Sequence, residues 1–82
     1  MSRGSQENRG VSRFGEKLKF LRTKSGMTLQ EVATALGLSA HGYISELEAG
    51  KKQPTVVLVL RVAELFGVTT DELLKDDVEL RK

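Results

Sequence analysis

The sequence predicts a single all-α domain built from five short helices. Apolar residues recur three and four positions apart along most of the 82-residue chain, which is the spacing of helices with one buried face. Glycines at positions 26, 37, 50 and 67 divide this pattern into segments of two to four turns, and glycine commonly ends a helix. Two segments open with Thr-x-x-Glu, the capping-box sequence that begins a helix. We therefore expect helices and no sheet.

The first ten residues differ in composition from the rest. They hold Ser, Gly, Gln, Asn and Arg and almost no apolar side chain, so burial cannot offset the entropy of ordering them. We expect a flexible arm over residues 1–10, a folded domain over 11–75 and a C-terminal tail over 76–82.

The bounds of the first three helices follow from caps and stops. The first covers about 13–24, and the second covers about 28–36 because Thr28 and Glu31 form a capping box. The third is expected over 39–48, with Ser39 as its N-cap. Ile44 and Leu47, three positions apart, are its expected buried residues.

The last two helices have equally clear starts. The fourth is expected over about 56–66, after a Thr55 cap and before Gly67. A second capping box, Thr69 with Glu72, opens a short fifth helix that ends near residue 74.

Composition excludes several classes of function. The chain has no cysteine and one histidine, His41, so it offers neither a disulfide framework nor a Cys- or His-based metal site. Its acids are spread along amphipathic helices without a nucleophile and base to pair, and we expect neither an enzyme nor a cofactor. No apolar run approaches the roughly 20 residues of a membrane span, and the polar N-terminus lacks a signal-peptide pattern. We expect a cytoplasmic protein.

Charge is distributed unevenly along the chain. Residues 1–25 hold seven basic and two acidic side chains, whereas residues 71–82 hold five acidic and three basic ones. A basic N-terminal part and an acidic C-terminal part fit a protein that contacts a polyanion with one surface only. A soluble protein with mixed surface charge explains the same asymmetry equally well.

Several short runs of residues carry a resemblance to a known family. They are Leu21-Arg22, Gly26 before Thr28, Leu29-Gln30-Glu31-Val32-Ala33, Leu36-Gly37-Leu38-Ser39, Tyr43-Ile44-Ser45-Glu46-Leu47-Glu48, Gly50-Lys51, Pro54, Val62-Ala63, Leu65-Phe66-Gly67-Val68 and Glu72-Leu73-Leu74. In this order they resemble the lambda-repressor-like (Cro/XRE-type) helix-turn-helix domains. The resemblance covers about 14–74. It implies a five-helix DNA-binding domain whose helix-turn-helix is formed by the second and third helices.

One spacing departs from the family pattern. Family members commonly place six steps between the glycine that ends the second helix and the isoleucine of the third, but Gly37 and Ile44 are seven steps apart. The extra residue lies within 38–43. Either the turn is one residue longer or the third helix starts differently.

The third helix is the expected recognition helix, because the N-terminal part of such a helix reaches base edges in the major groove. With Ile44 directed inward, Ser45 can hydrogen-bond either kind of base and Glu46 can accept from a cytosine amino group. A solvated acid at the rim is an equal alternative for Glu46, and a half-buried core aromatic is one for Tyr43. The expected base-reading residues are Ser39, Ala40, His41, Tyr43, Ser45 and Glu46.

Phosphate contacts are expected at both edges of the recognition helix, where the resemblance implies that the family holds the DNA backbone. Such contacts supply affinity with little sequence information. The resemblance also implies an ion pair between Arg22 and Glu48. The expected phosphate-binding residues are Arg22, Thr28, Gln30, Lys51, Lys52 and Gln53.

The fourth helix is more apolar than one core face requires. The family pattern implies that its core positions are Val56, Val59, Leu60, Val62, Ala63 and Phe66. Exposed apolar residues beyond these indicate an interaction surface, and a two-fold dimer would set two recognition helices about one DNA turn apart. A deeper core with a disordered tail is the alternative. The expected dimer residues are Val57, Leu58, Leu74, Val78 and Leu80.

These observations lead to a sequence-specific, repressor-like regulator that binds double-stranded DNA as a homodimer on a partly palindromic operator. An antagonist protein is a possible further partner. The alternative function is a protein-interaction module, such as an antitoxin or coactivator, that uses the same fold.

Overall fold

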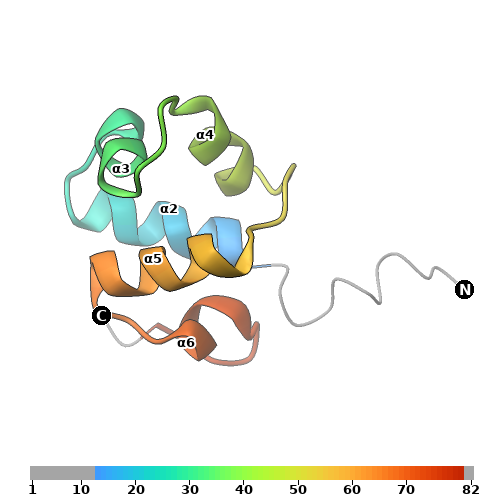
Figure 1. Ribbon diagram of the computed structural model, residues 1–82. Coiled ribbons are helices and arrows are strands. Elements are labelled where there is room, and N and C mark those ends of the chain that lie inside the picture. The colour runs from blue at the N-terminus through green and yellow to red at the C-terminus, as the bar shows by residue number, and fades with distance from the viewer. Residues whose placement is uncertain (1–12, 81–82) are drawn as a thin grey trace, which may run out of the picture.

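The structure is a computed structural model that describes residues 13–80 (Figure 1). Within that range it is all helical, as predicted. The expected arm over 1–10 lies outside the described residues. The helices are α2 (Phe14–Lys24), α3 (Leu29–Ala35), α4 (Gly42–Glu48), α5 (Val56–Phe66) and α6 (Thr70–Leu74).

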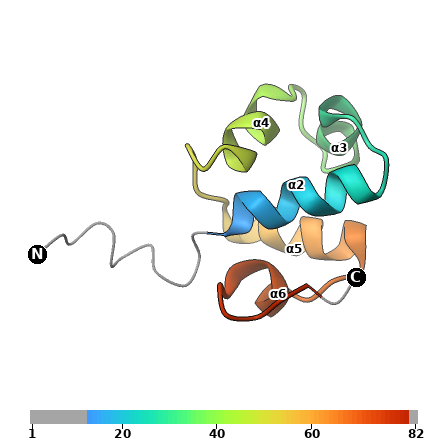
Figure 2. The ribbon, with the colours of Figure 1, turned by 180° about the vertical axis from the view of Figure 1, so that it is seen from behind.

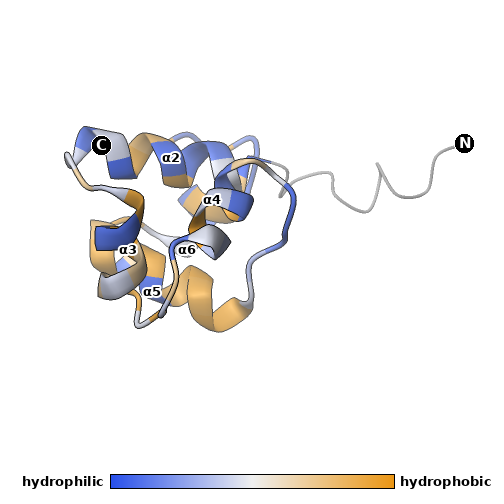
Figure 3. Cartoon of the chain, turned by 90° about the horizontal axis from the view of Figure 1, so that it is seen from above, coloured by the Kyte–Doolittle hydropathy of each residue, from blue (hydrophilic) through white to orange (hydrophobic). Residues whose placement is uncertain are grey.

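The helices are arranged in three tiers. α2 and α5 run in the same direction and form the middle tier, where Figure 3 shows them at opposite edges of the molecule. α3 and α4 stand together on one side of this tier, and α6 lies on the other side (Figures 1 and 2). The side chains between the tiers form one hydrophobic core, to which every described helix contributes. Its buried apolar residues are Phe14, Leu18, Leu21, Val32, Ala33, Leu36, Ile44, Leu47, Leu58, Val59, Val62, Ala63 and Leu73.

The predicted helix starts at three threonines are confirmed. Thr28 accepts from the Glu31 N–H at 3.0 Å, and the Thr28 N–H donates to the Glu31 carboxylate at 2.8 Å. Thr69 starts α6 with the same reciprocal pair, and Thr55 accepts from the Leu58 N–H at 3.1 Å. Each cap satisfies helix N–H groups that have no partner inside the helix.

The predicted start of the third helix is wrong. α4 begins at Gly42, its N-cap is His41, and no side chain caps it. The chain leaves α3 through Gly37, in the left-handed region at φ +79°, and Leu38 then packs against the core. Residues 39–41 are needed to cross from there to α4, so Ser39 lies too early to cap it. The extra residue lengthens the turn.

The expectation for α5 is wrong at three positions. Leu58, expected on the surface, is only 5% exposed, whereas Val56 and Leu60, expected in the core, are 78% and 50% exposed. Since α5 starts at Val56, the helical period places 58, 59, 62 and 63 on one inward face. Val57 is exposed, as expected.

The segment after α6 turns back onto α2. Lys17 is a buried lysine whose ammonium group donates to three backbone oxygens, those of Glu72 at 2.6 Å, Lys75 at 2.8 Å and Val78 at 2.6 Å. The Arg13 backbone N–H donates to the Asp76 carboxylate at 2.9 Å. Residues 75–80 are thereby tied to the body of the domain.

Candidate nucleic-acid interface

α4 presents one buried face and one open face. Ile44 and Leu47 are fully buried against the core, as predicted, and this fixes the direction of their neighbours. Ser45 is exposed, and the Glu46 side chain is 47% exposed, with its carboxylate 4.0 Å from the Lys52 ammonium group. Figure 3 looks onto this side of the molecule and shows α3 and α4 together on it. The open face of α4 therefore carries small polar and charged groups.

The other expected base-reading residues are distributed differently. Ser39, Ala40 and His41 are exposed, but they lie in the turn before α4. Tyr43 is half-buried and packs against the core, which favours the core-aromatic interpretation.

The ion pair between Arg22 and Glu48 is present. Arg22 donates to the Glu48 carboxylate through Nε at 2.7 Å and Nη2 at 3.0 Å, and through Nη1 to the Met27 carbonyl at 3.0 Å. Both side chains are mostly buried, at 14% and 7% exposure. The hydrogen bonds from the Glu48 carboxylate raise the pKa of the Arg22 guanidinium above its ordinary value. This bidentate ion pair connects the end of α4 to α2.

The remaining expected phosphate contacts lie at two edges of α4. Lys51, Lys52 and Gln53 are exposed in the loop after it. On α3, Gln30 is exposed and its amide donates to the Thr34 hydroxyl at 3.2 Å. Thr28 is exposed, and its hydroxyl accepts the capping bond.

An apolar surface lies at the start of α5. Val56, Val57 and Leu60 are each at least half exposed. The first turns of α5 form a continuous apolar stretch of ribbon in Figure 3. A crevice of about 270 Å³ borders it, lined by Pro54, Val56, Val59, Leu60, Thr70 and Leu74. Of the other expected dimer residues, Leu74, Val78 and Leu80 are half-buried, and Leu74 and Leu80 pack against the core.

Sequence reasoning missed two residues that position these elements. A Cβ at Gly15 would overlap the Leu47 carbonyl oxygen, so α2 and α4 touch through their backbones. A glycine inside a helix was the available signal, since it usually has a packing reason. Lys17 gives no such signal, because an isolated lysine on a helix normally indicates a solvated face.

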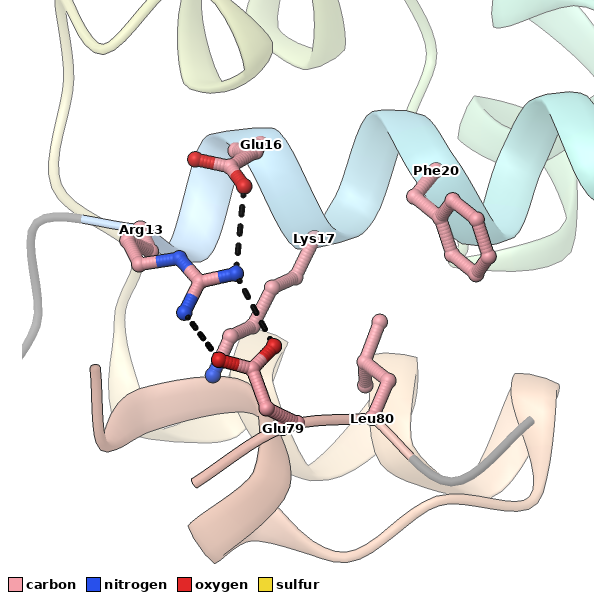
Figure 4. A pocket seen from close by; sticks show the side chains of 6 residues that line it. All are labelled: Arg13, Glu16, Lys17, Phe20, Glu79 and Leu80. Atoms are coloured by element: carbon pink, nitrogen blue, oxygen red, sulfur yellow. Dashed lines mark hydrogen bonds and ion pairs between the residues drawn. The ribbon is translucent and has the colours of Figure 1, made fainter. Parts of the chain in front are cut away.

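A crevice of about 310 Å³ beside Lys17 is closed at one end by an ion-pair cluster. Figure 4 shows Arg13 between two carboxylates, 3.2 Å from Glu16 and 2.9 Å from Glu79. The hydrogen bond from Arg13 lowers the pKa of Glu79 below its ordinary value of 4.5. The cluster holds the C-terminal segment on α2.

Within residues 13–80, no three His, Cys, Asp or Glu side chains gather closely enough to hold a metal ion. None of the helices described there has the length and hydropathy needed to cross a membrane.

The arrangement of α3 and α4 is that of a helix-turn-helix, and comparison with known proteins agrees. The helix-turn-helix family model matches residues 18–73. The chain belongs to this family.

Its curated relatives carry regulatory names. It is 40% identical over 62 residues to the prophage-derived HTH-type transcriptional regulator YonR of Bacillus subtilis, covering 76% of this chain and 56% of YonR. It is 37% identical over 60 residues to the HTH-type transcriptional regulator y4dJ of Sinorhizobium fredii, covering 73% and 77%. The CTXphi transcriptional repressor RstR of Vibrio cholerae is 30% identical over 63 residues, covering 77% and 56%. The match thus spans little more than half of YonR and of RstR.

Solved structures share the fold. The N-terminal DNA-binding domain of SinR from Bacillus subtilis superposes with a TM-score of 0.73 at 26% identity, covering 83% of this chain and 99% of that one. The restriction-modification controller protein C.AhdI of Aeromonas hydrophila gives a TM-score of 0.68 at 28% identity, covering 77% and 94%.

Proposed function

We propose that this chain is a cytoplasmic transcriptional regulator, without enzymatic activity, that binds a specific sequence of double-stranded DNA. The observation that carries the proposal is the way in which α4 is packed and fixed in the fold. Ile44 and Leu47 bury one face of it, the pair of Arg22 with Glu48 fixes its end, and a polar face is left open. A helix held in this way can enter the major groove without rearrangement, so little ordering entropy is lost on binding.

Base reading is assigned to Ser45 and Glu46 on the helix, with Ser39, Ala40 and His41 contributing from the turn. Glu46 is the most informative of them. A carboxylate repels phosphates but accepts a hydrogen bond from the amino group of cytosine. Lys52, 4.0 Å away, offsets part of its charge near the DNA backbone. We therefore expect each half-site to contain a G·C pair opposite Glu46.

Phosphate binding is assigned mainly to Lys51, Lys52 and Gln53, with Gln30 and Thr28 at the other edge of the helix pair. The contribution of Arg22 is indirect, because its guanidinium is engaged by Glu48 and Met27. The cations on this face are few. A dimer that uses Lys51 and Lys52 of each subunit would neutralise about four phosphates, so log Kobs should fall with log salt at a slope of about −3 to −4.

A homodimer is the assembly that we propose, and its contact surface is the start of α5. Val56, Val57 and Leu60 project beside the crevice at Leu74, so a second copy turned by a two-fold axis can place its projecting residues in that crevice. An isologous contact of this kind is the commonest oligomeric arrangement. It would pair two α4 helices for a partly palindromic operator.

The site proposal is tested by binding titrations with matched variants. The duplex that the wild-type chain enriches from a random pool is titrated by fluorescence anisotropy. Glu46→Gln should shift the preference at one position of each half-site from cytosine towards adenine, because glutamine pairs with adenine. Lys51→Ala should weaken binding to all duplexes and reduce the salt slope, whereas Lys75→Ala, directly after α6 on the opposite side, should change neither. An unchanged preference for Glu46→Gln would remove Glu46 from the base-reading set.

The dimer is tested separately by sedimentation. Leu60→Asp places a charge on the proposed contact without touching the buried face of α5. It should give a monomer that stays folded by circular dichroism and binds DNA weakly. A wild-type chain that stays monomeric both alone and on DNA would refute the dimer. A wild-type chain that binds a partner protein but no DNA duplex would favour the protein-interaction module instead.

A further inference from the structure

The end of α3 lacks a positive group of its own. Its last-turn carbonyls of Val32, Ala33 and Thr34 accept from backbone N–H groups of residues 36–38, at 3.0, 2.8 and 3.0 Å. No basic side chain lies in this last turn, although cations are favoured where the carbonyls of a helix converge. The carbonyl of Leu36, one residue beyond the helix, still needs a donor.

Arg61 supplies that donor from α5. Its Nη1 donates to the Leu36 carbonyl oxygen at 3.0 Å, across 25 residues of sequence. The guanidinium also lies directly over Gly37, because a Cβ at Gly37 would be 3.0 Å from the same nitrogen. Arg61 thus covers the residue whose φ of +79° reverses the chain.

The direction of the chain at this point determines where the turn goes. Leu38 packs into the core immediately afterwards. The exposed residues Ser39, Ala40 and His41 then connect it to α4. The peptide that joins Leu36 to Gly37 is separated from this exposed segment only by Leu38. A bond to its oxygen restrains rotation of this peptide plane, and so restrains the path of the longer turn.

We propose that Arg61 is a positioning residue for DNA reading: it holds the turn of residues 38–41 against the DNA without contacting the DNA itself. This inference rests on the proposed function. A basic residue near a DNA-binding element would otherwise be interpreted as a phosphate contact. Here Nη1 of the guanidinium donates to the Leu36 carbonyl oxygen instead, and the two roles predict different salt dependence of binding.

The experiment compares Arg61→Ala, Arg61→Lys and Lys51→Ala on two duplexes, the one enriched by the wild-type chain and a scrambled one, over a range of salt. Arg61→Ala should bind the enriched duplex about five- to tenfold more weakly, which is the net contribution of one ordinary hydrogen bond because Arg61 is exposed. It should leave scrambled-duplex binding and the salt slope unchanged. Arg61→Lys, which keeps a cationic donor, should recover most of the affinity. Lys51→Ala should weaken binding to both duplexes and reduce the slope by about 0.9 per lost contact.

Two results would overturn the inference. Equal weakening on both duplexes with a smaller slope would make Arg61 a phosphate contact, and unchanged affinity would leave it without a role in binding. All titrations are run where circular dichroism shows each variant folded, so that lost stability is not counted as lost recognition.

A DNA-free measurement separates this inference from the proposed function. The backbone amide resonances of residues 37–42 should shift in Arg61→Ala and return towards wild-type positions in Arg61→Lys. If the wild-type chain enriches no duplex, the proposed function fails, and the inference falls with it as a claim about DNA. If these resonances do not move, the inference fails even when DNA binding is present.

Discussion

Adding one methyl group at Gly15 should displace α4. A Cβ there would overlap the carbonyl oxygen of Leu47 and would lie 3.0 Å from that of Glu48. Both acceptors are backbone atoms in the last turn of α4, so they cannot rotate away as a side chain can. Gly15→Ala therefore forces α2 and α4 apart.

The size of the effect follows from two opposing terms. Overpacking costs about 1–3 kcal/mol, and the upper end applies because the contact is between two backbones. Alanine recovers up to about 1 kcal/mol of helix propensity. The net loss is about 2 kcal/mol, which lowers Tm by about 8–16 °C in a domain of this size. Since α4 carries the proposed base-reading residues, affinity for the preferred duplex should fall as well.

Gly42→Ala is the matched control. Gly42 is also helical, yet a Cβ there meets no atom within 4 Å. Its free energy of unfolding should stay the same or rise slightly. Urea denaturation of the two variants against wild type measures both predictions. A Gly15→Ala protein as stable as Gly42→Ala would refute the close approach of α2 and α4.

Three further perturbations test the contacts around α2. Arg22→Ala should cost about 2–3 kcal/mol in urea denaturation, because it leaves Glu48 largely buried without its partner, and should weaken DNA binding; unchanged Tm and affinity would contradict this. Lys17→Met should cost about 3 kcal/mol, since three carbonyls lose their donor, and a loss below about 1 kcal/mol would mean that water replaces the ammonium group. Glu79 has a lowered pKa in the folded chain, so its pairing with Arg13 stabilises the fold above the unfolded pKa and is lost as pH falls through the folded pKa. Glu79→Gln should therefore flatten the acid side of a stability-versus-pH curve, and a curve identical to wild type would exclude the effect.

Sequence reasoning succeeded where a structure is determined by neighbouring residues. Thr28 with Glu31 and Thr69 with Glu72 are within one helical turn of each other, so the capping boxes can be read directly. The inward direction of Ile44 and Leu47 is equally local. The pair of Arg22 with Glu48 spans 26 residues and was reached only through the family resemblance.

The predictions from sequence were wrong where a segment distant in the sequence determines the local structure. Ser39 has the chemistry of a cap, but the packing of Leu38 on the core moves the helix start to Gly42. In the apolar run of α5 every position can be buried, so the sequence does not select Leu58 over Leu60. Lys17 becomes a core residue only because the chain after α6 returns with its carbonyls. No local pattern marks such a return.

Selection from a random pool of DNA duplexes tests the central claim most directly. If α4 of each subunit reads one half-site, the enriched sequences should form a partly palindromic pair of half-sites whose centres are about 10 base pairs apart, or a multiple of that. Each half-site should contain a G·C pair assigned to Glu46. An output pool with the same base composition at every position as the input would contradict the account.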